Sequence, residues 1–230
     1  MMECDALGGM RSGRVARGNI NGGYEDTLGI ERMDGFMETD VKMKVAKSVR
    51  VITVAPVVAL VTLILLYLVR PLIFGGIFQL LMAILFLTVL PLLAYPLQKV
   101  LPGFRDRGRD GQRKLAFIMA VAGYVCGTVF AVAADAPKGV FQIYLTYLIS
   151  GVILSIFNKL LKIKASGHAC GVAGPVALLV HFCGINGYWA LLILPVVYWA
   201  CLAMKRHTPS QLLLGTITPL ISLVLVLLIF

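Results

Sequence analysis

The chain has 230 residues, of which 59% are hydrophobic and only 14% are charged, and its formal net charge is +10. A water-soluble globular fold has too little interior to hide so much apolar surface, so this composition excludes that class and indicates a membrane protein. The excess of positive charge suits anionic lipid headgroups, and in the absence of any supporting motif we expect no nucleic-acid partner.

Residues 1–50 differ from the rest of the chain. They are rich in Gly, Arg, Asp and Met and show no sustained apolar period. This pattern predicts a mostly disordered, basic, cytoplasmic tail. It is not a secretory signal peptide, because the first apolar stretch starts too late and is followed by further apolar stretches. The transmembrane domain is then expected to cover residues 51–230.

Seven apolar segments follow this tail, near residues 51–69, 72–97, 115–134, 140–157, 169–185, 188–204 and 211–230. About 20 apolar residues of helix cross the ~30 Å hydrocarbon core, and a helix satisfies its own backbone hydrogen bonds there. The two segments that flank Asn186 are short, and Arg70-Pro71 joins the first two abruptly, so six spans remain possible. The expected fold class is all-α, a polytopic transmembrane helical bundle of six to seven spans.

The placement of Lys and Arg predicts the orientation of this bundle. Short cytoplasmic loops of membrane proteins carry most of their Lys and Arg residues. With seven spans and a cytoplasmic N-terminus, every one of the 21 Lys and Arg residues except Arg70 and Lys138 lies on the cytoplasmic side. We therefore expect a multi-pass protein of the cell membrane with its N-terminus in the cytoplasm.

The cysteines and the third histidine carry little functional signal. The five cysteines show no metal-type spacing, and the chain has no Walker loop, dinucleotide fingerprint or HExxH motif, so no cofactor or metal is expected. His181 falls within the segment 169–185. Because an ionisable residue is costly inside a membrane, we expect His181 to face the bundle interior.

Two groups of polar residues stand at the starts of the fifth and seventh segments, and each contains a histidine. The first group is Lys162, Lys164, Ser166, Gly167 and His168, and the second is Lys205, Arg206, His207, Thr208 and Gln211. In the seven-span arrangement both groups lie on the cytoplasmic side. Imidazoles, cations and the amides of helix N-termini are the groups that bind a phosphate and transfer it. The pattern therefore predicts a phosphate site.

These groups resemble motifs of the type 2 phosphatidic acid phosphatase superfamily of membrane lipid phosphatases. Ser166-Gly167-His168 is similar to the family's Pro-Ser-Gly-His, with Ala165 in place of the proline. His207 is similar to the histidine of the last motif. Gln211 stands where that motif has Asp, and Cys201 where it has Arg. The resemblance covers roughly residues 75–230.

The resemblance implies a lipid phosphatase that hydrolyses a phosphate or diphosphate monoester, of the phosphatidate or isoprenyl diphosphate type, through a phosphohistidine and without a cofactor. His207 would be the nucleophile, His168 the general acid, and Gln211 would accept a hydrogen bond from the His207 ring. The residues that would bind the substrate phosphate are Lys162, Lys164, Ser166, Gly167 and Arg206. Arg206 or Lys205 would take the role of the arginine that the motif has at the position of Cys201.

Other interpretations stay open. The histidines are also explained as interfacial polar residues, and the lysines as cytoplasmic anchors. The Asp and Arg losses favour a catalytically reduced protein that binds lipid phosphate without turnover. A small-molecule transporter fits the hydrophobicity, although the chain lacks clear inverted repeats. The oligomeric state is left open by the sequence.

Overall fold

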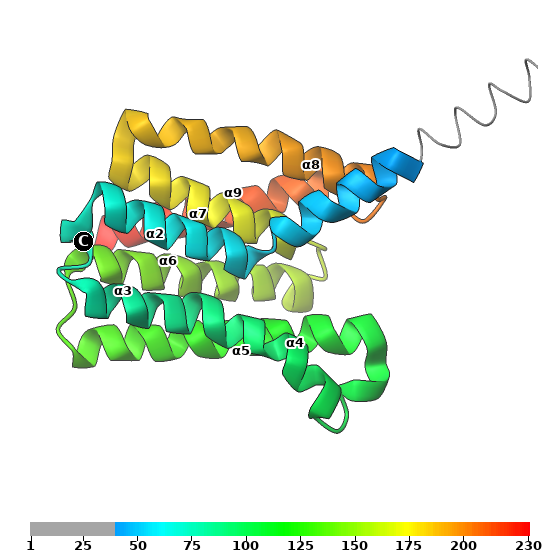
Figure 1. Cartoon of the computed structure of the whole chain (residues 1–230), viewed down its shortest axis with the longest axis horizontal. Coiled ribbons are helices and arrows are strands. Elements are labelled where there is room, and N and C mark those ends of the chain that lie inside the picture. The colour runs from blue at the N-terminus through cyan, green and yellow to red at the C-terminus, as the bar shows by residue number, and fades with distance from the viewer. Residues whose placement is uncertain (1–39) are drawn as a thin grey trace, which may run out of the picture. The chain divides into compact units, whose positions relative to one another are not determined.

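Figure 1 shows the computed structural model of the chain, which describes residues 40–230. The disorder predicted for residues 1–39 lies outside this range. Within the range, all regular structure is helical and no strand is present. The predicted all-α class is confirmed.

The helices follow one another with short connections. In chain order they are α1 (Asp40–Ile52), α2 (Ala55–Val69), η1 (Pro71–Ile73), α3 (Ile77–Ile84), η2 (Leu85–Val89), α4 (Leu90–Val100), η3 (Arg105–Arg107), α5 (Gly108–Ala133), α6 (Lys138–Ser155), η4 (Ile156–Leu160), α7 (Gly167–Cys183), η5 (Gly184–Leu192), α8 (Ile193–Ala203) and α9 (Pro209–Ile229). The segments η2 and η4 are single π-helical turns that continue α3 and α6.

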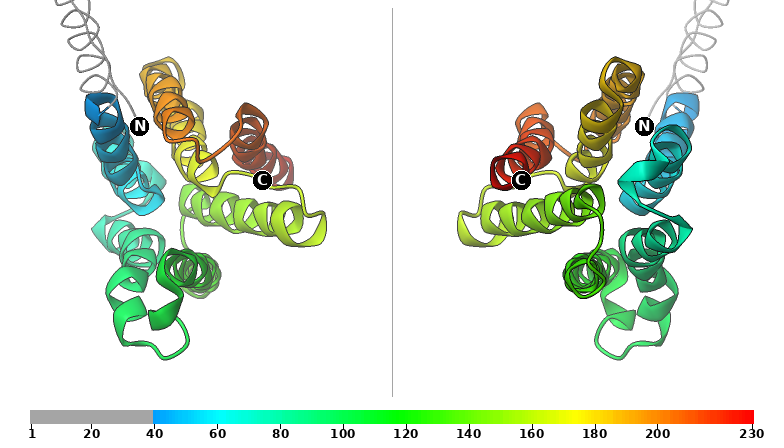
Figure 2. Two further views of the ribbon diagram at one scale, coloured as in Figure 1. Left: turned by 90° about the vertical axis from the view of Figure 1, so that its right-hand side faces the viewer. Right: turned by 90° about the vertical axis from the view of Figure 1, so that its left-hand side faces the viewer.

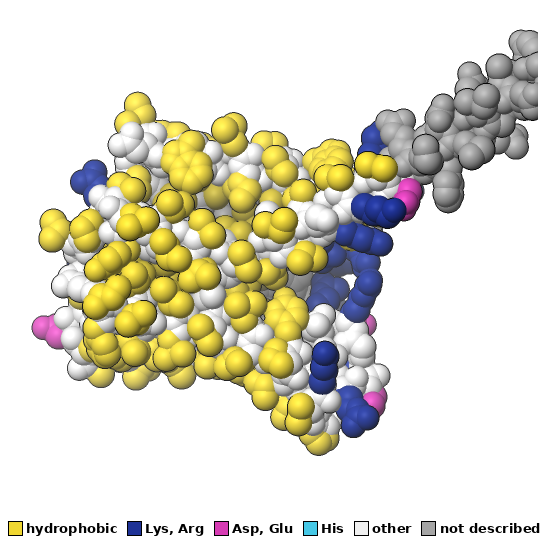
Figure 3. Space-filling model, viewed as in Figure 1, with side chains coloured by type: hydrophobic (Ala, Val, Ile, Leu, Met, Phe, Trp, Pro, Cys, Tyr) yellow, Lys and Arg dark blue, Asp and Glu magenta, His cyan; other side chains and the backbone are white. Residues whose placement is uncertain are grey.

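Several of these helices can cross a membrane. By length and composition, five helical stretches of residues 40–230 qualify, and α1 with α2 makes a sixth if that pair, bent by 56°, forms one span. The stretch Gly167–Ala203 folds back on itself, because α7 and α8 run side by side in opposite directions (Figures 1 and 2). Apolar side chains cover most of the face of the bundle that Figure 3 shows. The chain is therefore a multi-pass helical membrane protein.

Two expectations from the sequence are corrected. Residues 40–50 are not a disordered tail but belong to α1, where Lys, Met and Ala favour a helix and Ala46 is fully buried. His181 does not face the interior. It lies in the last turn of α7 with an exposed side chain, and its ring meets the ring of Phe182 at 4.7 Å between centroids. Because α7 already ends at Cys183, His181 lies near a helix end, where water is closer.

Glycines allow the helices of the bundle to approach closely. A Cβ atom added to Gly123 would lie 2.2 Å from the carbonyl oxygen of Phe86, and one added to Gly127 would lie 2.2 Å from the ring of Tyr144. These two glycines, four residues apart, place α5 directly against η2 and α6, as small residues commonly do in membrane bundles. A Cβ atom on Gly171 of α7 would likewise meet Ala55 of α2 at 2.3 Å.

One end of the bundle collects four polar connections. The α1–α2 kink, the start of α5, the α6–α7 loop and the α8–α9 loop all lie at the same end, on the right in Figure 1. Lys and Arg side chains gather there (Figure 3). Both histidine groups therefore meet at this end.

Candidate functional site

The end of α8 positions His207. The N–H of Lys205 donates to the carbonyl oxygen of Leu202 at 2.9 Å, and the N–H of Arg206 donates to that of Cys201 at 3.1 Å. This is a Schellman ending, in which the left-handed residue is usually glycine, whereas here Lys205 has φ +50°. A side chain in that region costs about 1–2 kcal/mol. The turn leads the chain directly into His207 and α9.

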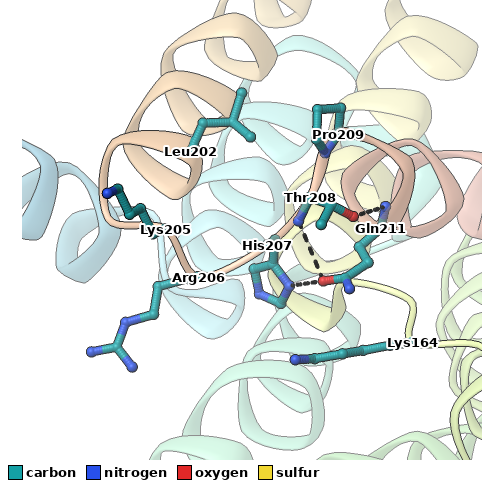
Figure 4. Close-up of a pocket in the computed structure, with 8 residues that line it drawn as sticks. All are labelled: Lys164, Leu202, Lys205, Arg206, His207, Thr208, Pro209 and Gln211. Carbon is teal, nitrogen blue, oxygen red and sulfur yellow. Dashed lines mark hydrogen bonds between the residues drawn. The ribbon is translucent and has the colours of Figure 1, made fainter.

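The start of α9 holds the imidazole of His207. Thr208 and Gln211 form a capping box, in which the N–H of Thr208 donates to Gln211 Oε1 at 3.4 Å and the N–H of Gln211 donates to Thr208 Oγ1 at 3.4 Å. His207 Nδ1 lies 3.2 Å from the same Oε1 (Figure 4). Because a carbonyl oxygen can only accept, Nδ1 carries the proton, and Nε2 of the neutral ring keeps a free lone pair.

Ser166 joins the two histidine groups through the backbone. Its N–H donates to the carbonyl oxygen of Gln211 at 2.9 Å, and its Oγ accepts from the N–H of Ala169 at 3.3 Å, which caps α7. Gly215 makes this contact possible, since a Cβ there would lie 2.3 Å from the Ser166 carbonyl oxygen. Ser166 is fully buried, so its hydroxyl supports the site and does not line it.

His168 follows at the second position of α7 and contacts the α1–α2 kink. Its Nε2 lies 3.1 Å from Thr53 Oγ1. The Thr53 hydroxyl has one hydrogen, which it donates to the carbonyl oxygen of Val49 at 2.7 Å. Nε2 of His168 must then be the donor, and Nδ1 is the ring nitrogen left for a proton transfer.

The α6–α7 loop carries the predicted lysines and is anchored by Asn158. Asn158 Oδ1 accepts from the N–H of Ala165 at 3.1 Å, and Asn158 Nδ2 donates to the carbonyl oxygen of Leu154 at 2.9 Å. Lys164 reaches from this loop to a position beneath the His207 ring (Figure 4). The anchored loop thus keeps one cation beside the imidazole.

An open pocket of about 440 Å³ lies over His207. Its lining consists of Lys164, Leu202, Lys205, Arg206, His207, Thr208, Pro209 and Gln211. Lys205 and Arg206 line it, but in Figure 4 their side chains point away from the His207–Gln211 pair. Lys162, Gly167 and His168 were also predicted at the site and do not line this pocket. Lys162 and Gly167 are both exposed.

Two further cations, from α1 and α5, act on the site. Arg50 interacts electrostatically with both His168 and His207, and Arg113 of α5 interacts with His207 and Arg50. Arg50 had been counted only among the charges of the tail. The helix-forming composition of residues 42–47 was the signal that could have revealed α1, although nothing in it points toward the histidines.

The surroundings of His207 favour its neutral form. Burial lowers the pKa of His207 below its ordinary value of 6.5, and the positive charges of Arg50, Lys164 and Arg113 lower it further, while the hydrogen bond to Gln211 acts in the opposite direction. At pH 7 the ring is therefore mostly uncharged, and its Nε2 lone pair is available.

No protein-family model, curated protein or solved structure matches this chain. In the part of the chain that the structure describes, no three His, Cys, Asp or Glu side chains form a group that could hold a metal ion. From residue 42 onward the only carboxylate side chains are Asp106, Asp110 and Asp135. Within residues 42–230, Lys and Arg residues therefore greatly outnumber carboxylates.

The arrangement has the parts needed for phosphoryl transfer. A neutral imidazole with a free Nε2 can attack phosphorus, a second imidazole can move a proton, and several cations can balance phosphate charge. The backbone N–H groups of Gly167 and His168, in the first turn of α7, have no partner within the helix and can donate hydrogen bonds to an anion.

Proposed function

We propose that this protein is a membrane lipid phosphatase that hydrolyses a phosphate or diphosphate monoester of a lipid through a phosphohistidine on His207. The observation that carries the proposal is the hydrogen bond from His207 Nδ1 to Gln211 Oε1, which leaves Nε2 free beside a second histidine and several cations. The resemblance to type 2 phosphatidic acid phosphatases, with a core of about residues 75–230 and six to seven spans, belongs to the same proposal.

In the first step, the Nε2 lone pair of His207 attacks phosphorus, and the bond between phosphorus and the leaving oxygen breaks. His168, in its doubly protonated form, gives the Nδ1 proton to that oxygen while Nε2–H stays on Thr53. The negative charge of the bound substrate favours this protonated form of His168. Gln211 keeps the proton on Nδ1 of His207 and so directs the attack to Nε2.

In the second step, water attacks the phosphohistidine. His168, now neutral, takes a proton from the water, the bond between phosphorus and Nε2 breaks, and inorganic phosphate leaves. Lys164 and the first amides of α7 balance the charge on the phosphoryl oxygens in both steps. No cofactor takes part in this sequence.

The site's place in the bundle suits a lipid substrate. The pocket opens at the polar end of the bundle, next to an apolar lateral surface (Figures 1 and 3). A headgroup at the membrane surface can reach the histidines while its hydrocarbon chains stay among lipids. The proposed substrates are phosphatidate and isoprenyl diphosphates.

The test is phosphate release by the detergent-purified protein from phosphatidic acid, phosphatidylglycerol phosphate and C15 to C55 isoprenyl diphosphates. His207→Ala should abolish release, and His168→Ala should lower it by about 10²- to 10⁴-fold, the usual contribution of a general acid or base. His181→Ala is the matched control, since that histidine is exposed and contacts Phe182, and it should retain wild-type activity. Equal activity in the His207 and His181 variants would refute the proposal.

A second candidate function is the binding of lipid phosphate without turnover. The observation that favours it is Gln211 itself, because an amide cannot stabilise the His207 imidazolium by charge as a carboxylate would. A folded protein that binds the lipids of the panel but releases no phosphate from any of them would favour this function.

A further inference from the structure

Arg50 has an unusual position for a residue of a surface helix. It belongs to the last turn of α1 and its side chain is only half exposed. Its guanidinium is within electrostatic range of side chains from four other parts of the fold, namely Cys201 of α8, Tyr95 of α4, His168 of α7 and His207 of the α8–α9 loop. Thr53, three residues after Arg50, lies 3.1 Å from His168 Nε2, so this end of α1 lies against the start of α7 and Arg50 is within electrostatic range of the candidate site.

The groups around Arg50 are mostly positive. Arg109 and Arg113 act on it from α5, and Arg206 acts on it from the α8–α9 loop. The α4–α5 corner that presents the two arginines is held in place by Gln98, whose Nε2 donates to the carbonyl oxygen of Gly108 at 2.8 Å. Figure 3 shows the resulting recess, lined by Lys and Arg side chains, between α1 and this corner.

Within residues 42–230, carboxylates offer little compensation for these positive charges. Asp110, in the first turn of α5, and Asp106 are the acids nearest to Arg113 in sequence, and neither is among the groups that act on Arg50 or His207. Bringing several cations together at a partly buried place is costly without a counter-charge. A bound anion between Arg50, Arg113 and His207 would supply that charge.

We propose that Arg50 and Arg113 together bind the non-bridging oxygens of the phosphoryl group that His207 attacks, so that α1 and α5 supply the guanidinium groups in place of the arginine that the related motif carries at the position of Cys201. This inference rests on the proposed function for its substrate. The planar guanidinium suits two phosphoryl oxygens at once, which a lysine does not reproduce. Arg50 and Thr53, three residues apart at the end of α1, would then both belong to the site.

The position of Arg50 also accounts for Cys201. Cys201, the position at which the related motif carries its own arginine, is fully buried and lies within electrostatic range of Arg50. A guanidinium from another helix can thus serve the same phosphate. Arg206, in contrast, points away from His207 in Figure 4.

The test uses the full chain in detergent with the best lipid substrate of the panel. Arg50→Gln should lower kcat by about 10²- to 10³-fold, as the loss of one transition-state donor does, and Arg50→Lys should recover part of it. Lys47→Gln is the matched control, because it removes one charge from the same helix one turn earlier. It should stay within about threefold of the wild type, since Lys47 lies in a different pocket.

Chemical rescue separates binding from a folding defect. Added guanidinium chloride at low millimolar concentration should raise the activity of Arg50→Ala at least tenfold and leave His207→Ala inactive. No rescue of a folded Arg50→Ala protein, or equal activities of Arg50→Gln and Lys47→Gln, would overturn the role of Arg50.

The same variants distinguish this inference from the proposed function. If the wild type releases no phosphate, the readout is the thermal stabilisation caused by orthovanadate, which resembles a phosphoryl group in transfer. Stabilisation of the wild type and of Lys47→Gln, but not of Arg50→Gln, would support the clamp although the phosphatase proposal had failed. Equal stabilisation of all three would refute the clamp.

Discussion

At the scale of single residues, hydrogen bonds determine which nitrogen of each histidine is free. Gln211 Oε1 accepts from a backbone N–H and from His207 Nδ1 at once, so the amide orientation and the imidazole tautomer are set together. Thr53 sets the tautomer of His168, because the Thr53 hydroxyl donates its one hydrogen to the carbonyl oxygen of Val49 and can only accept from His168 Nε2. Two uncharged side chains thereby take over an orienting task that carboxylates often perform.

The charges around His207 predict the pH dependence of the proposed reaction. Because burial and nearby cations lower the pKa of His207, the acid limb of kcat/KM should lie below pH 6.5. Lys164→Gln removes one of these cations, so the pKa of His207 should rise and the limb should move to higher pH by a few tenths of a unit or more.

The pH–rate profile of purified protein measures this shift. Lys162→Gln is the control, since Lys162 belongs to the same loop but does not line the pocket and is not among the charges that act on His207. Its profile should match that of the wild type. Identical shifts in the two variants would contradict a specific effect of Lys164.

Thr53 predicts a second effect at this scale. Thr53→Val keeps the shape of the side chain but leaves His168 Nε2 without an acceptor, which should cost about 1–3 kcal/mol, or roughly ten- to a hundredfold in kcat/KM. Thr53→Ser keeps the hydroxyl and should stay close to the wild type. Steady-state kinetics of the two variants check this, and a Thr53→Val protein as active as Thr53→Ser would argue against the contact.

At the scale of secondary-structure elements, the site depends on how closely α9 packs against the start of α7. The carbonyl oxygen of Ser166 lies where a Cβ of residue 215 would be, and the N–H of Ser166 donates to Gln211. Gly215→Ala would therefore push α9 away from Ser166, and such overpacking costs about 1–3 kcal/mol. We expect a lower melting temperature together with reduced activity.

Gly174→Ala is the matched control for this prediction. It adds the same methyl group on α7, where the nearest atom, the Cβ of Pro219 in α9, would be 3.5 Å away in ordinary contact. Thermal unfolding of the detergent-solubilised proteins should show a loss for Gly215→Ala only. Equal melting temperatures would show that the α7–α9 contact yields easily.

Sequence patterns predicted the elements better than the site. Hydropathy located the apolar helices because each must match the thickness of the membrane, and helix starts placed His168 and His207 at one end of the bundle. The histidine spacing also predicted the contact of His207 with Gln211, since residues i and i+4 share a helix face.

The contributions of α1 could not be predicted in this way. Arg50 and Thr53 are more than 100 residues before the histidines, and only the bend between α1 and α2 brings them there. Their charge and polarity fit a tail equally well. The phosphate-binding role of Lys162 stays a prediction, since Lys162 is exposed and does not line the pocket over His207.

At the scale of the whole molecule, the charges divide the two ends of the bundle. Among residues 42–230, only Arg70, Asp135 and Lys138 belong to the loops opposite the site, and Lys138 donates to the carbonyl oxygen of Phe230. This asymmetry predicts that the site faces the cytoplasm. In intact cells with a cysteine-free variant, a membrane-impermeant maleimide should label Lys138→Cys.

Lys114→Cys provides the comparison on the other end. It should be labelled only after the cells are permeabilised, and the cysteine-free parent should not be labelled in either case. Labelling of Lys114→Cys in intact cells would reverse the predicted orientation and place the pocket outside.

The hydrogen bond from Ser166 to Gln211 has a consequence for biosynthesis. The ribosome synthesises Arg50 and Thr53 long before His207, so these two residues are in place before most of the site has been made. Until α9 is inserted, Ser166 N–H lacks its acceptor and the start of α7 is incomplete. A released chain that ends before Pro209 therefore carries both histidines but not a formed pocket, and the proposed phosphatase activity should require the last helix.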